Sequence, residues 1–304
     1  MSNYSTEVSF AGISFKNPIT TASGTFGSGM EYGEFFDIDA LGAVTTKGVS
    51  AVPWEGNPTP RVAEVPGGML NAIGLQNPGV DVFIKRDLAF LKEHDTGIIV
   101  NVCGHTLEEY LEVVEKLADQ PVDMLEINIS CPNVKNGALA FGTDPDMVFK
   151  VTDAIKKKAA QPVVMKLSPN VTSISEIAKA AESAGADGIS LINTITGMKI
   201  DVERQSFVLA NKTGGMSGAA IHPVAVRMVY EAAHAVDIPI IGMGGVMSAA
   251  DAIELMLAGA TMVAVGCATF TKPDIALDIL GGIEDYMERH QIGDIKDIIG
   301  AVKE

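Results

Sequence analysis

Short apolar runs alternate along the chain with longer segments that have the spacing of amphipathic helices. Eight of these runs are rich in Val or Ile and apolar at most positions, as expected for strands buried on both faces of a parallel sheet. They cover residues 18–23, 43–47, 98–101, 124–129, 163–167, 188–193, 239–243 and 261–265. Between them, Thr106, Ser173 and Ser248 each precede an acidic residue by three positions, which is typical of a helix N-terminus.

Eight such alternations in about 300 residues predict an α/β fold, a (β/α)8 TIM barrel formed by one domain over residues 1–304. A doubly wound open sheet is the alternative, although it usually has fewer strands and a switch point in their order. Residues 8–15, with Ala11 and Gly12 at their centre, indicate a short N-terminal β-hairpin outside the barrel. The connections 48–75 and 194–221 are too long for simple turns. We expect both to be active-site loops without secondary structure at the carboxyl-terminal rim.

Composition and charge exclude several classes of protein. Of the 304 residues 47% are hydrophobic, which excludes a disordered chain, and 22 Lys and Arg against 38 Asp and Glu give a net charge of −16. That charge repels a phosphate backbone, and the basic run 156–158 falls at an expected helix end, so we expect no nucleic-acid partner. We find no signal peptide and no run suited to cross a bilayer, so we expect a cytoplasmic protein without membrane contact. Three cysteines without a CxxC pair predict neither a disulfide framework nor a metal site.

Polar side chains recur where the predicted strands end, which is where a barrel of this kind has its active site. They are Ser23, Lys47, Asn101, Asn128, Lys166, Asn193 and Thr194. A buried amide without a partner costs about 1–3 kcal/mol. Loop capping would explain any one of these residues, but the whole set indicates a polar ligand. Gly244 and Gly245 after the seventh strand and Gly266 after the eighth expose backbone N–H groups, which suits a phosphate group.

Cys131, in the sequence SCPN after the fourth strand, is the most specific candidate for chemistry. A thiol has an ordinary pKa near 8.5, so it can take up a proton where the site favours the thiolate. Cys103 is expected to be a small buried hydrophobic residue, and Cys267 to present its backbone near the phosphate. No histidine is placed to pair with Cys131 in a nucleophile arrangement, so cysteine-protease chemistry has little support.

Several sequence blocks resemble the dihydroorotate dehydrogenases of pyrimidine biosynthesis, in the branch whose catalytic subunit is NAD-linked (class 1B). The blocks are ASGTFG (22–27), TTKGVS (45–50), GGMLNAIGLQN (67–77), NISCPNVK (128–135), INT (192–194) and GGV (244–246). They occur in the family's order over nearly the whole chain. The chain departs from the usual family pattern at Asn136-Gly137-Ala138, where His-Gly-Gly is common, and at Cys267 and Thr269.

The resemblance implies an FMN-dependent oxidation of (S)-dihydroorotate to orotate in UMP biosynthesis, with Cys131 as the general base that takes the C5 proton while hydride passes from C6 to FMN. Around the flavin it implies Ser23, Lys47, Gly48, Asn101, Asn128, Lys166, Ile192 and Gly218, with Gly244, Gly245, Gly266 and Cys267 at its phosphate. For the substrate it implies Lys47, Asn71, Ala72, Ile73, Gly74, Leu75, Asn128, Asn193 and Thr194.

The same resemblance implies a partner. Members of the NAD-linked branch work as a homodimer that associates with an iron–sulfur flavoprotein subunit in a 2+2 heterotetramer. FAD and a [2Fe–2S] cluster on that partner relay electrons to NAD⁺. The three cysteines of this chain are too few for such a cluster, which usually needs four ligands. A membrane-linked member would carry an N-terminal hydrophobic extension and a serine base, and neither is expected here.

Four alternatives remain open at the level of sequence. The first is a fumarate-linked class 1A dihydroorotate dehydrogenase, which also uses a cysteine. The second is a flavin enzyme for another dihydropyrimidine, such as dihydrouracil. The third is a non-redox aldolase or isomerase barrel for a sugar phosphate, in which Lys166 would form a Schiff base. The fourth is an inactive binding subunit, against which the full set of polar rim residues argues.

Overall fold

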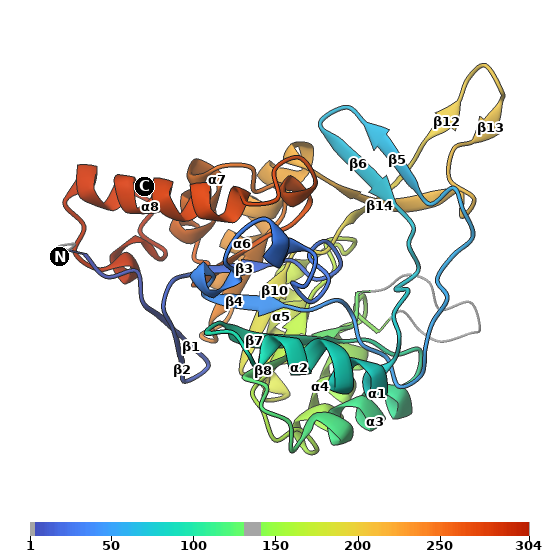
Figure 1. Cartoon of the computed structure of the whole chain (residues 1–304), viewed down its shortest axis with the longest axis horizontal. Coiled ribbons are helices and arrows are strands. Elements are labelled where there is room, and N and C mark those ends of the chain that lie inside the picture. The colour runs from blue at the N-terminus through green and yellow to red at the C-terminus, as the bar shows by residue number, and fades with distance from the viewer. Residues whose placement is uncertain (1–3, 131–140, 304) are drawn as a thin grey trace.

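Eight parallel strands form the central sheet in the part of the chain that the computed structural model describes, residues 4–130 and 141–303 (Figure 1). Neighbouring strands are paired in the order β3-β16-β15-β10-β9-β8-β7-β4. Their bounds are Ile19–Thr21 (β3), Ala43–Thr45 (β4), Gly97–Val102 (β7), Met124–Asn128 (β8), Val163–Lys166 (β9), Gly188–Leu191 (β10), Ile240–Met243 (β15) and Met262–Val265 (β16). Apart from Gly97, every residue of these strands is buried, as the apolar runs predicted.

Side-chain hydrogen bonds join the first and last strands of this order and so complete the barrel. The Thr21 hydroxyl in β3 accepts from the Thr45 N–H at 3.0 Å and donates to the Thr45 carbonyl at 3.1 Å. The hydroxyls of Thr20 and Thr45 lie 3.0 Å apart. The expected (β/α)8 barrel is confirmed, and the alternative of an open doubly wound sheet is wrong because β3 and β4 meet.

Helices cover the outside of the barrel (Figure 1). Their bounds are Val80–Val82 (α1), Leu88–Leu91 (α2), Leu107–Leu117 (α3), Pro145–Lys156 (α4), Ile174–Ser183 (α5), His222–Ala233 (α6), Ala249–Leu257 (α7) and Ile275–His290 (α8), with a π-helical turn over Phe83–Asp87. Short 3₁₀ turns cover Tyr32–Glu34, Ile38–Ala40, Ala219–Ile221, Cys267–Phe270 and Ile295–Ile298. The side chains of Thr106, Ser173 and Ser248 accept from the backbone three residues on, so the predicted N-caps are confirmed. None of the helices described is both long and apolar enough to cross a bilayer.

The N-terminal hairpin is also confirmed. Strands β1 (Val8–Phe10) and β2 (Ile13–Phe15) pair antiparallel and are joined by Ala11 and Gly12. Both turn residues have positive φ, 50° and 81°. Glycine adopts that conformation without strain, which explains the sharp reversal at Gly12.

The expectation that residues 48–75 and 194–221 lack secondary structure is wrong. They form strands β5 (Val62–Val65), β6 (Gly68–Asn71), β11 (Ile195–Met198) and β14 (Thr213–Ser217), which pair antiparallel in the order β11-β14-β6-β5. We call this the rim sheet. A hairpin of β12 (Ile200–Asp201) and β13 (Ser206–Phe207) extends beyond it (Figure 1). The glycines that suggested a loop allow close approach instead, because a Cβ at Gly215 would lie 2.0 Å from the Thr194 hydroxyl oxygen.

Candidate active site

A cavity of about 310 Å³ lies between the carboxyl ends of the barrel strands and the rim sheet. It brings together nearly all the residues singled out from the sequence. Those from the barrel are Ser23, Lys47, Gly48, Asn101, Asn128, Lys166, Ile192, Asn193, Thr194, Gly244, Gly245, Gly266 and Cys267, and those from β6 and the segment after it are Asn71, Ala72, Ile73, Gly74 and Leu75. Two candidates stand apart. Cys131 lies outside the described residues, and Gly218 is not among the described residues that line the cavity.

Gly218 has a structural reason to be glycine. Its φ is 116°, and a Cβ there would lie 2.4 Å from the Gly68 Cα and 2.6 Å from the Gly67 carbonyl oxygen. The residue therefore lets the chain after β14 pass against the start of β6. A contact of Gly218 with a flavin stays a prediction.

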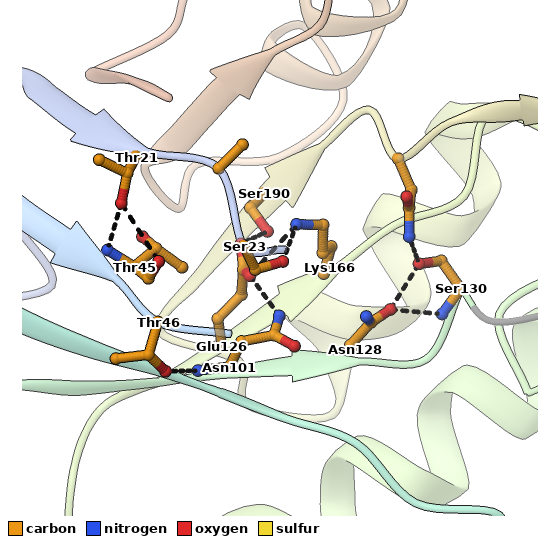
Figure 2. A network of polar contacts seen from close by, with 12 residues as sticks. Thr21, Ser23, Thr45, Thr46, Asn101, Glu126, Asn128, Ser130, Lys166 and Ser190 are labelled. Carbon is orange, nitrogen blue, oxygen red and sulfur yellow. Dashed lines mark hydrogen bonds and ion pairs between the residues drawn. The ribbon is translucent and has the colours of Figure 1, made fainter. Parts of the chain in front are cut away.

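A buried polar network forms one wall of the cavity (Figure 2). Its centre is Glu126 in β8, a fully buried carboxylate that sequence inspection did not single out. Glu126 accepts from Asn101 Nδ2 at 2.5 Å and Ser190 Oγ at 2.6 Å, and its oxygen lies 3.3 Å from Lys166 Nζ. Lys166 also donates to Ser23 Oγ at 3.0 Å. Glu126 is the one charged residue of the apolar run 124–129, and that exception is the signal that could have identified it.

Only one end of the Asn101 side-chain amide has its hydrogen-bonding capacity satisfied within the described part of the chain. Its Nδ2 group donates to Glu126, whereas the buried Oδ1 atom has no hydrogen-bond partner among the described residues. Such an orphan acceptor costs about 1–3 kcal/mol unless a ligand or water supplies a donor. A Cβ at Gly48 would lie 3.1 Å from this oxygen, so glycine at that position leaves space beside it.

A second chain of hydrogen bonds runs from β8 to the end of β10 (Figure 2). Asn128 Oδ1 accepts from the Ser130 hydroxyl at 2.7 Å and from the Ser130 N–H at 3.3 Å. Asn193 Nδ2 donates to the same hydroxyl, and Asn193 Oδ1 accepts from the Thr194 N–H at 2.7 Å. Tyr110 anchors the chain by donating to the Asn128 carbonyl at 2.7 Å. Two of the predicted substrate-binding amides are therefore coupled through Ser130, which the sequence analysis did not assign.

Lys47 and Asn71 reach the cavity from opposite sides. The Lys47 N–H donates to the Gly27 carbonyl at 2.7 Å, and a Cβ at Gly24 would lie 3.8 Å from the Lys47 ammonium. Asn71 in β6 donates to the Gly215 carbonyl of β14 at 3.4 Å. A cationic group and an amide thus flank the space between barrel and rim sheet. This combination suits a ligand that carries a carboxylate beside a polar ring.

A glycine turn closes the other end of the cavity. Gly244 and Gly245 follow β15 with φ of 128° and 68°, and a Cβ at Gly245 would lie 2.7 Å from the His222 Cβ. His222 at the start of α6 bonds the Gly244 carbonyl through Nδ1 at 2.8 Å, and its Nε2 lies 3.2 Å from a Glu254 carboxylate oxygen. A turn of this kind, held rigidly and free of side chains, can bind an anion through its N–H groups.

Cys267 lines the cavity together with this turn. Burial raises the pKa of its side chain above the ordinary value, and hydrogen bonds with Ser217 and with the backbone of Cys267 itself only partly oppose that effect. A thiol whose pKa is raised is a poor nucleophile and a poor base near neutral pH. The backbone of Cys267, rather than its sulfur, is therefore the part suited to an anionic ligand.

The protein is thus a (β/α)8 barrel with a polar cavity at the carboxyl ends of its strands, which is where barrels of this kind have their active sites. The chain belongs to the dihydroorotate dehydrogenase family, whose model matches residues 5–287. Relatives named "Dihydroorotate dehydrogenase B (NAD(+)), catalytic subunit" include one from Lachnoclostridium phytofermentans, 64% identical over 98% of this chain and 99% of its own. A second, from Alkaliphilus metalliredigens, is 59% identical over 99% of this chain and 100% of its own. The resemblance drawn from the sequence blocks is confirmed.

Proposed function

We propose that this chain oxidises (S)-dihydroorotate to orotate with FMN bound in the rim cavity, as a step of pyrimidine biosynthesis in the cytoplasm. The observation that carries the proposal is the convergence of lysine and amide side chains from separate strands on one cavity in a chain of this family. Relatives that match this chain over nearly its whole length carry the same activity in their names, which supports the substrate.

The cavity has features that fit FMN. The orphan acceptor Asn101 Oδ1 needs an N–H donor, which the pyrimidine part of the flavin ring offers. Ser23, Gly48, Asn128, Lys166 and Ile192 would lie along the ring. The turn of Gly244 and Gly245, with Gly266 and the Cys267 backbone, would hold the phosphate. Bound there, FMN supplies the acceptor for a hydride.

Dihydroorotate would bind beside the flavin through its carboxylate and its ring amides. Lys47 provides the cation for the carboxylate in a chain whose net charge of −16 otherwise disfavours anions. Asn71, Asn128 and Asn193 supply hydrogen bonds to the ring, with Thr194 and residues 72–75 completing the enclosure. Because Asn128 Oδ1 already accepts from Ser130, its Nδ2 end is the part oriented to donate to a substrate carbonyl.

Cys131 is proposed as the base that removes the C5 proton. It follows Ser130, whose hydroxyl is fixed at the cavity by Asn128 and Asn193. The sulfur takes the proton as the C5–H bond breaks, the C5–C6 double bond forms, and the hydride leaves C6. Holding both positions in line lowers the barrier without a strong base.

The electrons would leave through a second protein. The relatives' names contain "catalytic subunit" and NAD(+), which supports a separate subunit that reacts with NAD⁺. FAD and a [2Fe–2S] cluster would reside on that partner, since three cysteines cannot ligate the cluster here. We further propose a homodimer of this chain within a 2+2 heterotetramer.

The Schiff-base alternative is disfavoured by the setting of Lys166. An amine attacks a carbonyl only in its neutral form, whereas the Lys166 ammonium is paired with the buried Glu126 carboxylate. A protein trapped by borohydride with a sugar phosphate, and lacking flavin, would reverse this assessment.

The decisive experiment is the absorption spectrum of the purified protein, before and after anaerobic addition of dihydroorotate. We expect a flavin spectrum that bleaches with dihydroorotate and not with dihydrouracil. Cys131→Ala should retain the flavin and bleach at least ~100-fold more slowly near neutral pH. Cys131→Ser should regain part of the rate as the pH rises. A colourless protein, or bleaching by dihydrouracil alone, would contradict the proposal.

A further inference from the structure

Glu126 contributes a buried negative charge directly behind the wall on which the proposed flavin would lie. Its carboxylate is fully buried, and it lies within hydrogen-bond distance of donors on three other strands: Asn101 in β7, Lys166 in β9 and Ser190 in β10 (Figure 2). Burying a charge without such partners would be prohibitively costly. The network is thus built around this one group.

The carboxylate dictates what the wall presents to a ligand. It only accepts hydrogen bonds, so Asn101 must turn its Nδ2 group toward Glu126 and keep Oδ1 as an acceptor. Lys166 is held between Glu126 and the Ser23 hydroxyl. The wall therefore offers a ligand the Asn101 oxygen as an acceptor and the Lys166 ammonium as a cation. The negative charge of Glu126 behind the wall partly cancels the electrostatic field of Lys166.

We propose that Glu126 is a positioning residue that sets the reduction potential of the bound flavin. The inference rests on the proposed function. Reduction adds negative charge to the ring, and Lys166 stabilises that charge. Glu126, at 3.3 Å from Lys166 Nζ in a region of low dielectric, opposes the stabilisation. It thereby holds the potential below the value that Lys166 alone would give.

Glu126→Gln separates the charge from the geometry. The Ser190 hydroxyl can accept as well as donate, so glutamine can direct Nε2 to Ser190 and keep Oε1 for Asn101 and Lys166. We expect the ratio of affinities for reduced over oxidised FMN to rise at least tenfold, equivalent to a two-electron midpoint about 30 mV higher. The midpoint is measured photochemically on the holoprotein against a reference dye. An unchanged or lower midpoint overturns the proposal.

Two further variants complete the test. Glu115→Gln makes the same chemical change at an exposed position of α3, where Glu115 pairs with Lys158, and it should leave the midpoint unchanged. An equal shift in that variant would show a mere effect of net charge and overturn the proposal. Glu126→Asp keeps the charge but withdraws it from Lys166 and Asn101. It should give a midpoint between those of wild type and Glu126→Gln, with FMN bound at least fivefold more weakly.

Each pattern of results is decisive. Should Glu126→Gln not fold, the aspartate variant decides alone, and a midpoint at or below that of the wild type overturns the role of Glu126. Equal shifts in the glutamine and aspartate variants would indicate a packing defect and likewise overturn it. Failure of the proposed function itself is seen separately, in a wild-type protein that binds no FMN or is not reduced by dihydroorotate.

Discussion

The Asn193 side-chain amide donates to the Ser130 hydroxyl, so the end of β10 is tied to the residue that precedes Cys131. Ser130 passes the interaction on to Asn128 Oδ1 at 2.7 Å, and all three residues line the cavity. The proposed base therefore follows directly after a residue that is fixed by the same amides that are proposed to hold the substrate. We therefore infer that the proposed substrate-binding amides and the proposed base are coupled through the Ser130 hydroxyl group.

Ser130→Ala removes that hydroxyl and its hydrogen bonds with the side chains of Asn128 and Asn193, and each amide oxygen keeps only a bond from a backbone N–H. A typical hydrogen bond contributes about 1 ± 0.5 kcal/mol, and two are lost, so we expect kcat/KM for dihydroorotate to fall roughly tenfold or more. The flavin spectrum should be unchanged, since Ser130 is not among the residues proposed to line the flavin. Ser9→Ala, at an exposed position of β1, is the matched control and should leave kcat/KM as in the wild type. An unaltered kcat/KM in Ser130→Ala would refute the coupling.

Gly245→Ala tests the glycine turn. Its φ of 68° disfavours any side chain, and the new Cβ would meet the His222 Cβ at 2.7 Å and the Gly218 carbonyl oxygen at 2.8 Å. We expect the free energy of unfolding to fall by at least about 2 kcal/mol, and FMN to be retained poorly on gel filtration. Gly281→Ala in α8 meets nothing within 4 Å, so it should be neutral or stabilise by up to about 1 kcal/mol. Equal stability of the two variants would show that the turn tolerates side chains.

The sequence predicted the parts of the fold that depend on local patterns. Buried strands such as β8 appear as apolar runs, and a cap such as Thr106 is defined by residues three positions apart. The pairing at the centre of the rim sheet is non-local and escaped prediction for that reason: β14 lies against β6, which precedes it by about 140 residues. Glycines that look like loop residues in isolation are there to permit that approach.

The candidate site was predicted to a similar extent. Residues at strand ends, such as Lys166, follow from the barrel itself, because the carboxyl ends of parallel strands meet at one rim. Glu126 stands out locally as the one charged residue of an apolar run, but its role depends on partners from three other strands, and no local pattern reveals those partners. The resemblance assigned Gly218 to the flavin. The structure instead explains why this residue is glycine, because a side chain there would collide with Gly68.

Asp39 gives the protein a stability contribution that is lost in acid. Partial burial opposes ionisation of Asp39, but the hydrogen bond with His94 at 2.7 Å, a backbone group of Asp95 and the charge of Lys16 lower its pKa below the ordinary value. A carboxyl group whose pKa is lower in the folded state stabilises it above the unfolded pKa of about 4, and that contribution disappears as the pH falls through the folded value.

Asp39→Asn should therefore lower the unfolding temperature at pH 7 and have no effect at a pH below the folded pKa. The effect at pH 7 will be small, because the Asp39 side chain is 37% exposed and solvent screens the pair. Thermal unfolding followed by circular dichroism provides the measurement. The pH is varied from about 2 to 7, a range that brackets the ordinary carboxyl pKa of about 4. Asp119→Asn, at an exposed position after α3, is the control. A difference between Asp39→Asn and wild type that persists unchanged in acid would contradict the assignment.

Thr→Val substitutions at Thr21 and at Thr152 should change the free energy of unfolding in opposite directions. The reason is that the Thr21 hydroxyl has hydrogen-bond partners and the Thr152 hydroxyl has none among the described residues. The Thr21 hydroxyl satisfies both the N–H and the carbonyl of Thr45, and both residues are buried. Thr21→Val keeps the shape but leaves a buried donor and a buried acceptor without this partner, so we expect a loss of about 2–4 kcal/mol in the free energy of unfolding.

Thr152 in α4 is also fully buried, yet its hydroxyl has no partner in the described part of the chain. Thr152→Val should therefore stabilise the fold by about 1 kcal/mol. Urea unfolding of both variants measures the two values, and two losses of equal size would mean that the hydroxyl of Thr21 does not close the barrel.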